Sequence, residues 1–165
     1  MTGSPSSGAS AAGAVAGESA ELVGLIEQEL SLLLRRSRST SMSLARKVHP
    51  DMDAAGYALV SQIDLGTASG RAGVRASDVA LALGLDKSTV SRGITQLEGL
   101  GLVERISDPN DGRARLLRLT ATGAERFGAI RRQRRAEFEG ILSRWRGEDL
   151  SALATLLTRL NADFS

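Results

Sequence analysis

Cysteine is absent from this sequence, which also has one histidine and only two lysines, Lys47 and Lys87, among its 21 basic residues. Without cysteine the chain has no disulfide, no thiolate metal site and no thiol redox switch. The single histidine, His49, has no cysteine partners with which to form a metal site. We therefore expect a protein with no metal ion and no cofactor.

Long hydrophobic runs and aromatic side chains are scarce. No apolar run approaches the roughly 20 residues of a membrane span, and no basic segment followed by a hydrophobic core marks a signal peptide. These absences predict a cytoplasmic protein that does not enter a membrane. Aromatic residues make up only 3% of the 165 residues, so the core of one ordinary domain must be built from Leu, Val, Ile and Ala.

Recognisable catalytic motifs are missing as well. The sequence shows no nucleophile–base arrangement and no glycine-rich loop that would cradle a phosphate. The carboxylates of Asp51 and Asp53 fall at the start of a predicted helix, where capping explains their spacing. The sequence therefore predicts a protein that is not an enzyme.

A helix-turn-helix is predicted between residues 76 and 97. The first helix covers residues 76–83, and Gly84 ends it because glycine takes the left-handed C′ conformation without steric cost. Asp86 is a good N-cap for the second helix. Apolar residues at i, i+4 and i+7 give that helix one buried stripe: Val90, Ile94 and Leu97.

The opposite face of the second helix is polar in an unusual way. Nearly all of its side chains are short hydrogen-bond donors or acceptors, whereas a merely solvated face more often has Glu and Lys pairs. Such a face suits the base edges and phosphates of a DNA major groove. We predict DNA contacts from six of its residues: Lys87, Ser88, Thr89, Ser91, Arg92 and Gln96.

A β-hairpin is predicted to follow. Residues 102–107 mix apolar and polar side chains as a half-buried strand does, residues 108–112 are dense in turn formers, and residues 115–119 form a second strand. Val74 is predicted to add a short strand that pairs with this hairpin. A helix-turn-helix followed by a hairpin is a winged helix, so the fold class is mainly α with a small β-wing.

The segments DKSTVSRGITQLEGLGLVER and DPNDGRARLLRLTATG resemble the MarR family of transcriptional regulators. The family's wing signature is an Asp, any residue, an Arg, and a Leu-Thr pair that closes the second strand. Asp111, Arg113, Leu119 and Thr120 fit it. The resemblance implies a dimeric, sequence-specific regulator, commonly a repressor. It also implies a small aromatic or phenolic effector that binds between the dimer helices and the DNA-reading heads.

The wing offers further candidates for DNA contact. We expect Arg113 to enter the minor groove, whose negative potential attracts arginine. Asp111 either orients the Arg113 guanidinium, which we favour, or folds the turn unaided. Arg75 and Arg115, like Lys87, are candidates for phosphate contacts.

The flanking helices have more apolar surface than one winged helix can cover. We predict a disordered tail (1–17), a helical dimerisation region (18–47 and 121–165) and a winged-helix DNA-binding region (48–120). Within 121–165, one helix is expected to run from Ala121 to about Trp145, and a second to follow the break at Gly147. An intramolecular bundle is the alternative to a homodimer. The resemblance favours the dimer, whose two-fold symmetry matches a palindromic double-stranded operator.

Two further clusters allow more than one interpretation. Arg46, His49 and Tyr57 are candidates for an effector pocket, although the small residues around them can equally serve close helix packing. The arginines between 131 and 135 are either a solvated face or partners for Glu27 and Glu29 of a second protomer.

Two classes of function therefore remain. The first is a DNA-binding regulator relieved by an effector. The second is a constitutive winged-helix module that acts in DNA architecture or protein interaction. The polar face between residues 88 and 96 favours the regulator, because an interaction module would expose apolar residues there.

Overall fold

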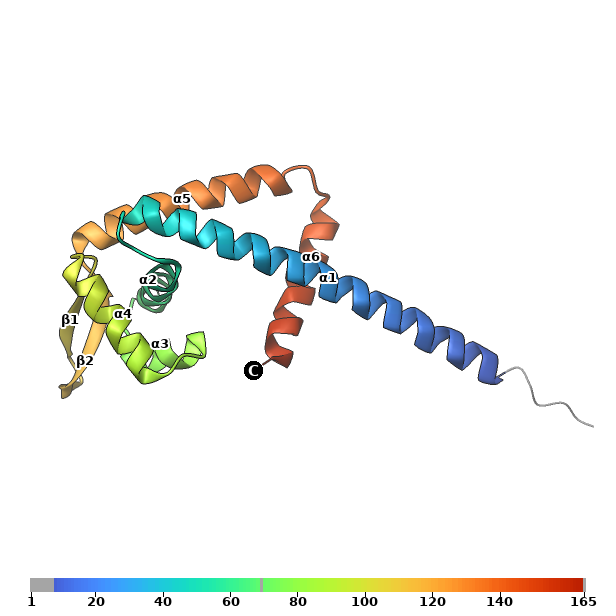
Figure 1. Ribbon diagram of the computed structural model, residues 1–165, viewed down its shortest axis with the longest axis horizontal. Helices are drawn as coiled ribbons and strands as arrows, with labels where there is room; N and C mark the ends of the chain where they lie inside the picture. The colour runs from blue at the N-terminus through green and yellow to red at the C-terminus, as the bar shows by residue number, and fades with distance from the viewer. Residues whose placement is uncertain (1–7, 69, 165) are drawn as a thin grey trace, which may run out of the picture.

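The computed structural model describes residues 8–68 and 70–164. The described chain folds into helices and one two-stranded sheet, which confirms the predicted fold class (Figure 1). The elements are α1 (Gly8–Val48), α2 (Ala54–Thr67), α3 (Ala76–Leu83), α4 (Lys87–Gly99), β1 (Val103–Asp108), β2 (Asp111–Leu119), α5 (Ala121–Leu142) and α6 (Gly147–Asp163).

Local signals set the ends of the helices in the reading head, the unit formed by α2, α3, α4 and the β1–β2 wing. Gly84 ends α3 with φ of 61°, a left-handed conformation that costs glycine nothing. The side chains of Asp53, Asp86 and Thr120 accept backbone N–H groups at the starts of α2, α4 and α5. The caps at Asp53 and Asp86 were predicted, and both are confirmed.

The hydrophobic core lies between α2, α4 and the base of the wing. The predicted stripe of α4 is buried there against α2. The ring of Tyr57 packs on Phe127 of α5, with ring centroids 5.5 Å apart and planes tilted by 54°. The largest fully buried side chains are those of Leu59, Ile63, Ile94, Leu97, Leu102, Val60 and Val90.

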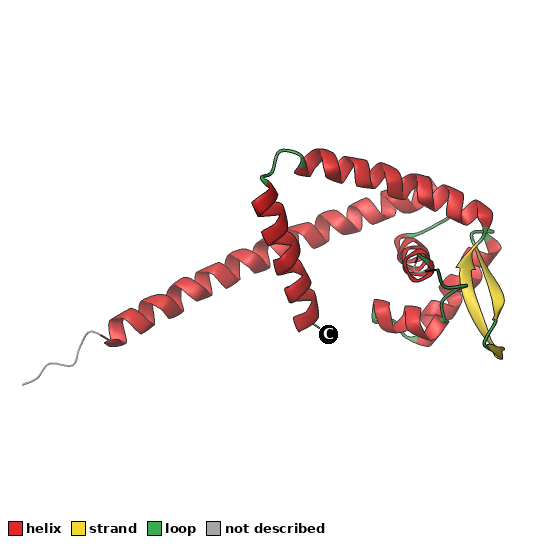
Figure 2. Ribbon diagram, turned by 180° about the vertical axis from the view of Figure 1, so that it is seen from behind, coloured by secondary structure: helices red, strands yellow, loops and turns green. Residues whose placement is uncertain are grey.

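The wing is an antiparallel pair in which Val103 lies opposite Leu119 and Glu104 opposite Arg118. The register shifts between Ser107 and Asp108, just before the turn. Val74 forms an isolated bridge with Leu117 of β2, as predicted. Figure 2 shows this hairpin at one end of a molecule that is otherwise helical.

Two helix boundaries differ from those predicted. Helix α1 begins at Gly8 instead of residue 18, because the alanines before residue 18 favour helix and extending an existing helix needs no new nucleus. Residues 1–7 of the predicted tail lie outside the described residues. Helix α5 ends at Leu142 instead of Trp145, whose N–H bonds the Leu142 carbonyl (2.9 Å) in a turn that leads into α6.

The flanking helices extend away from the reading head. Helix α5 packs beside the C-terminal part of α1, and α6 folds back from the end of α5 (Figures 1 and 2). No residue of α6 is buried. None of the helices in the described ranges is long and apolar enough to cross a membrane.

Candidate nucleic-acid interface

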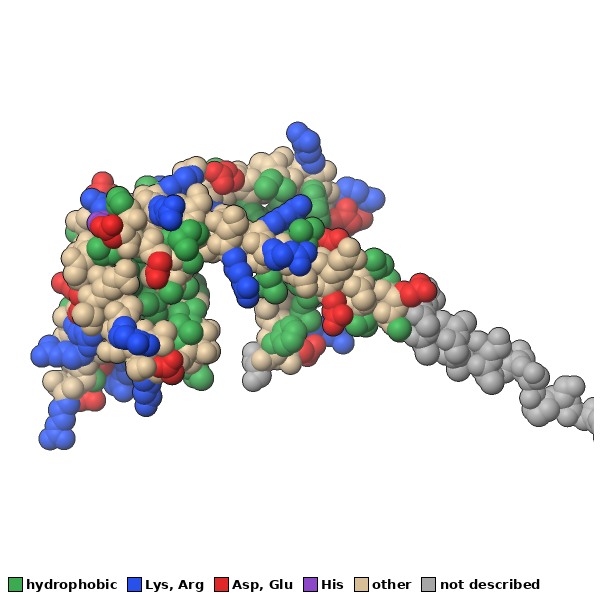
Figure 3. All heavy atoms as spheres, viewed as in Figure 1, with side chains coloured by type: hydrophobic (Ala, Val, Ile, Leu, Met, Phe, Trp, Pro, Cys, Tyr) green, Lys and Arg blue, Asp and Glu red, His purple; other side chains and the backbone are tan. Residues whose placement is uncertain are grey.

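Helix α4 presents the polar face that the sequence predicted. Thr89 is half-buried, whereas the other five predicted contacts on this helix are exposed on the side opposite the core. Lys and Arg side chains gather around α3, α4 and the wing (Figure 3). The candidate interface thus consists of Lys87, Ser88, Thr89, Ser91, Arg92 and Gln96 on α4, with the wing residues beside them.

The first turn of α4 is organised by Asp86. The hydroxyls of Ser88 and Thr89 each donate to its carboxylate at 2.6 Å, and the Thr89 backbone N–H donates at 2.9 Å. These hydrogen bonds, that from Ser88 first, hold the pKa of Asp86 far below its usual value. The hydroxyl protons of Ser88 and Thr89 are therefore already used, which leaves these two oxygens to act as acceptors toward DNA.

The remaining side chains of the α4 face differ in how free they are. Gln96 donates its Nε2 to the Asp51 carbonyl at 3.2 Å and so ties α4 to the turn after α1. Arg92 makes only a long contact, 3.4 Å, from Nη2 to the Thr89 hydroxyl. Lys87 has no ion pair with any described residue. Lys87 and Arg92 are thus the side chains of this face with the most unused donors.

At the wing tip, Asp111 folds the turn. Its Oδ1 accepts the backbone N–H of Arg113 at 3.1 Å, and no ion pair joins it to the Arg113 guanidinium within the described chain. The orienting role that we favoured is not observed, because two-residue spacing lets a carboxylate reach the local backbone first. The Arg113 side chain is exposed and has no partner among the described residues.

The other two arginines predicted at the wing are engaged inside the protein. Arg75 Nη2 lies 3.1 Å from Oδ2 of Asp108, a buried carboxylate that is 8% exposed. The Asn110 N–H, followed by the Arg75 guanidinium, lowers the pKa of Asp108. Arg115 donates Nη1 to the Ser107 hydroxyl at 2.8 Å across the hairpin. Sequence reasoning missed the Arg75–Asp108 pair because 33 residues separate its members.

The three candidate effector residues do not share a cavity within one chain. Tyr57 is buried in the core, and His49 Nδ1 accepts the backbone N–H of Asp51 at 3.2 Å. Arg46 lines an open hollow on the outside of α1 together with Ser39, Met42, Ser43 and Lys47. The core position of Tyr57 favours a packing role, since its ring is covered by Phe127.

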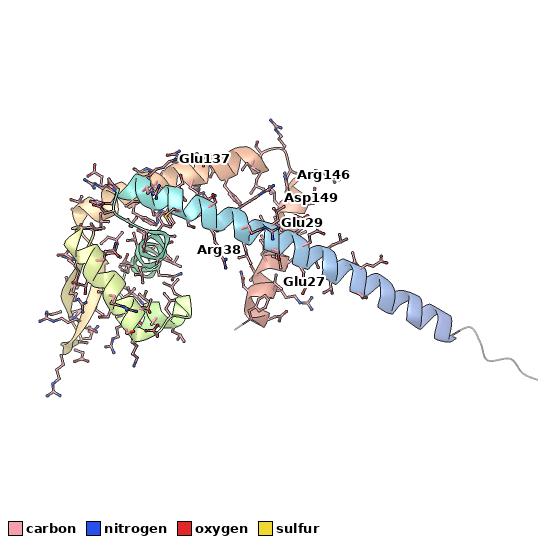
Figure 4. The ribbon with its side chains drawn as sticks, viewed as in Figure 1. Glu27, Glu29, Arg38, Glu137, Arg146 and Asp149 are labelled. Carbon is pink, nitrogen blue, oxygen red and sulfur yellow. The ribbon has the colours of Figure 1, made fainter. Side chains whose placement is uncertain are left out.

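Two of the clustered arginines on α5 have partners in their own chain. Arg131 pairs with Asp64 of α2, and Arg135 pairs with Glu139 one turn later on α5. The hydrogen bond that Arg135 Nε donates to the Glu139 carboxylate raises the pKa of the guanidinium. Figure 4 labels Glu27 and Glu29 on α1, and neither forms an ion pair within the described residues.

A helix-turn-helix with an exposed polar second helix, followed by a hairpin with a free arginine near its tip, defines a winged-helix DNA-binding protein. Residues 65–114 match the model of the MarR family. The HTH-type transcriptional regulator YxaD of Bacillus subtilis (strain 168) is 32% identical over 143 residues, which cover 86% of this chain and 94% of YxaD. The chain belongs to the MarR family of DNA-binding transcriptional regulators.

Solved structures share the fold. FabT of Streptococcus pneumoniae, crystallised in complex with DNA, aligns with a TM-score of 0.70 at 21% identity. The alignment covers 86% of this chain and 96% of the FabT chain. PcaV of Streptomyces coelicolor, crystallised with its natural ligand, has a TM-score of 0.55 at 23% identity and covers 81% of this chain and 92% of its own.

Proposed function

We propose that the protein is a homodimeric, sequence-specific regulator that binds a palindromic operator in the cytoplasm and represses transcription until a small aromatic or phenolic effector releases it. The observation that carries the proposal is the exposed polar face of α4, opposite a fully buried apolar stripe. This arrangement leaves the helix free to enter a major groove while its other side holds it to the core.

Within this proposal, the free donors supply most of the readout. We expect Arg92 of α4 to bind a guanine edge bidentately and Lys87, at the start of the same helix, to bind a phosphate. Arg113 at the wing tip enters the adjacent minor groove. Ser88, Thr89 and Ser91 add short contacts, with the first two acting as acceptors.

The dimer is supported by apolar side chains that one chain leaves uncovered. On α1 Leu34 is 61% exposed, on α5 Ile141 is 64% exposed, and on α6 Leu156 is 62% exposed. Exposed large apolar side chains on three neighbouring elements of the chain are typical of a surface that a partner covers. A two-fold dimer through these helices presents two copies of α4, which must lie roughly 34 Å apart to read successive major grooves.

An effector site is supported by the hollow on α1. Arg46 and Lys47 line it beside Met42 and two serines, so it combines positive charge with apolar surface. That combination suits an aromatic acid or a phenolate. In a dimer this part of α1 lies where the flanking helices meet the reading head, so a bound ligand that prefers one geometry shifts the separation of the two α4 helices.

Selection of bound sequences from random duplex DNA, followed by affinity measurement, tests the proposal. We expect a palindromic consensus, and Arg92→Ala should cost about 1–3 kcal/mol of binding to it. Arg144→Ala, which removes an exposed arginine remote from the reading head, is the matched control and should bind as the wild type does.

Equal affinity for random and selected DNA at physiological salt would contradict sequence-specific binding. The selection is repeated with aromatic acids and phenols, which should release the DNA from the wild type and less readily from Arg46→Ala. If no such compound changes the affinity, the constitutive winged-helix module becomes the better description.

A further inference from the structure

The loop before α3 is joined to the wing by an ion pair between Arg75 and Asp108. This pair belongs to no recognisable sequence motif. Arg75, the N-cap residue of α3, has no capping hydrogen bond of its own. Its Nη2 instead reaches Asp108, the last residue of β1, at 3.1 Å, and lies 3.9 Å from the Asp111 carboxylate at the start of β2. One guanidinium thus faces a carboxylate from each wing strand, on either side of the turn.

The wing needs such a tether because a two-stranded hairpin has little stability of its own. Its base is held by buried Leu117 and by the paired hydrogen bonds between Val74 and Leu117, 2.9 and 2.8 Å. A Cβ at Gly73 would stand 2.8 Å from the Leu117 carbonyl oxygen, so the loop passes as close to β2 as glycine allows. Beyond this base, Gly112 and Arg113 of the wing are exposed.

Asp108 connects the tether to the turn. One carboxylate oxygen accepts the Asn110 N–H at 2.9 Å, and the other accepts from Arg75. Asp111, on the far side of the turn, holds the backbone N–H of Arg113 at 3.1 Å. Arg75 is thus linked to both carboxylates, by a hydrogen bond to Asp108 and by a longer ion pair to Asp111, which holds the residue that we expect in the minor groove.

We propose that Arg75 and Asp108 form a clamp that fixes the angle of the wing tip, so that Arg75 is a positioning residue for Arg113 and not a phosphate contact. This inference rests on the proposed function in one respect, namely that the wing binds DNA. A clamp of this kind raises affinity by removing the entropy that a free wing would lose on binding.

The clamp and a direct phosphate contact predict opposite effects when Asp108 loses its charge. If Arg75 binds phosphate, Asp108→Asn releases the guanidinium and removes a negative charge near DNA, so affinity rises or stays constant. If Arg75 is a clamp, the same change weakens binding. Asn retains a side-chain oxygen for the Asn110 N–H, so the turn keeps its hydrogen bond while the ion pair is lost.

The test is a double-mutant cycle with Arg75→Ala, Asp108→Asn and the double variant, measured on the selected operator at one fixed salt concentration. We expect each single variant to bind about tenfold more weakly, and the double variant to bind no more weakly than either, because both remove the same interaction. Asp78→Asn is the matched control and should not lose affinity, because it removes a carboxylate that lines a hollow together with Arg75 and Asp108 but pairs with neither.

Two readouts separate positioning from a general loss of structure. Chemical footprinting should show the minor-groove protection by the wing lost in both single variants, while the major-groove protection by α4 remains. Hydrogen exchange of the free proteins should show faster exchange for amides 107–115 alone.

The clamp is overturned if Asp108→Asn binds as tightly as the wild type while Arg75→Ala does not, if the two losses add, or if wing exchange is unchanged. Failure of the wild type to select any sequence would instead overturn the proposed function, and the exchange measurement would still decide the clamp.

Discussion

At the scale of single residues, the reading face has two kinds of polar side chain. Ser88, Thr89 and Gln96 already donate to protein acceptors, so their contacts with DNA exchange one hydrogen bond for another. Arg92 and Arg113 give up little when they bind. Because net affinity reflects this difference, we expect the two arginines to dominate the free energy of binding.

Arg113→Ala should weaken operator binding by about 1–3 kcal/mol, the range for an arginine that reads DNA, with little change in thermal stability. The side chain is exposed and the Asp111 hydrogen bond uses only its backbone, which alanine retains. Fluorescence anisotropy and thermal denaturation measure the two quantities.

Arg118→Ala is the control on the same strand. Its guanidinium pairs with Glu104 at 2.8 Å, at the base of the hairpin, so the change should alter operator affinity much less than Arg113→Ala does. A melting temperature that falls by many degrees in Arg113→Ala would show that this side chain is structural.

At the scale of elements, the sequence predicts best where local chemistry decides. The bounds of α3 and the cap of α4 follow from Gly84 and Asp86, because a left-handed glycine and an N-cap act within a few residues. The start of α1 was missed because an alanine-rich segment has helix propensity without any apolar stripe to mark it.

The candidate site shows the same division. The α4 face is a matter of helical spacing, so its members were predicted together. The pairs Arg75–Asp108 and Gln96–Asp51 join residues 33 and 45 positions apart, and no local pattern reports which polar groups the fold brings into contact. The sequence therefore made Arg75 a candidate for a phosphate contact and did not reveal its ion pair with Asp108.

The junction between the wing and α5 permits a prediction about packing. A Cβ at Gly123 would clash with the Leu102 carbonyl oxygen, which also accepts the Thr120 N–H at 3.0 Å. Backbone cannot move aside as a flexible side chain does, so Gly123→Ala should lower the free energy of unfolding by about 1–3 kcal/mol. Chemical denaturation measures it.

Gly140→Ala tests the same substitution on the same helix without the clash. Nothing lies within 4 Å of a Cβ at Gly140, so alanine should stabilise the protein by about 0.4–1 kcal/mol through its lower unfolded-state entropy. Equal effects at the two positions would show that α5 does not pack closely on residue 102.

At the scale of the whole molecule, the reading head has a buried hydrophobic core and the flanking helices do not. The reading head buries its own apolar residues, whereas α1 and α6 expose theirs along much of their length (Figure 3). This difference predicts that the reading head folds within one chain and that the flanking helices need a second copy. A second copy that covers α6 would account for an apolar stripe with no residue buried within its own chain.

If the chain dimerises as we propose, Ile26→Glu with Leu157→Glu should leave only monomers at micromolar concentration. The two side chains are 53% and 42% exposed on α1 and α6, and a two-fold interface would bury each charge twice. Light scattering should show the mass fall from twice 17.3 kDa to 17.3 kDa, with a matching loss of affinity for the full palindrome.

Leu81→Glu, at an 85% exposed position on α3, is the control and should remain dimeric. A double variant that is still dimeric would show that the dimer contact lies elsewhere. A wild type that is monomeric would contradict the dimer, and with it the spacing argument for a palindromic operator.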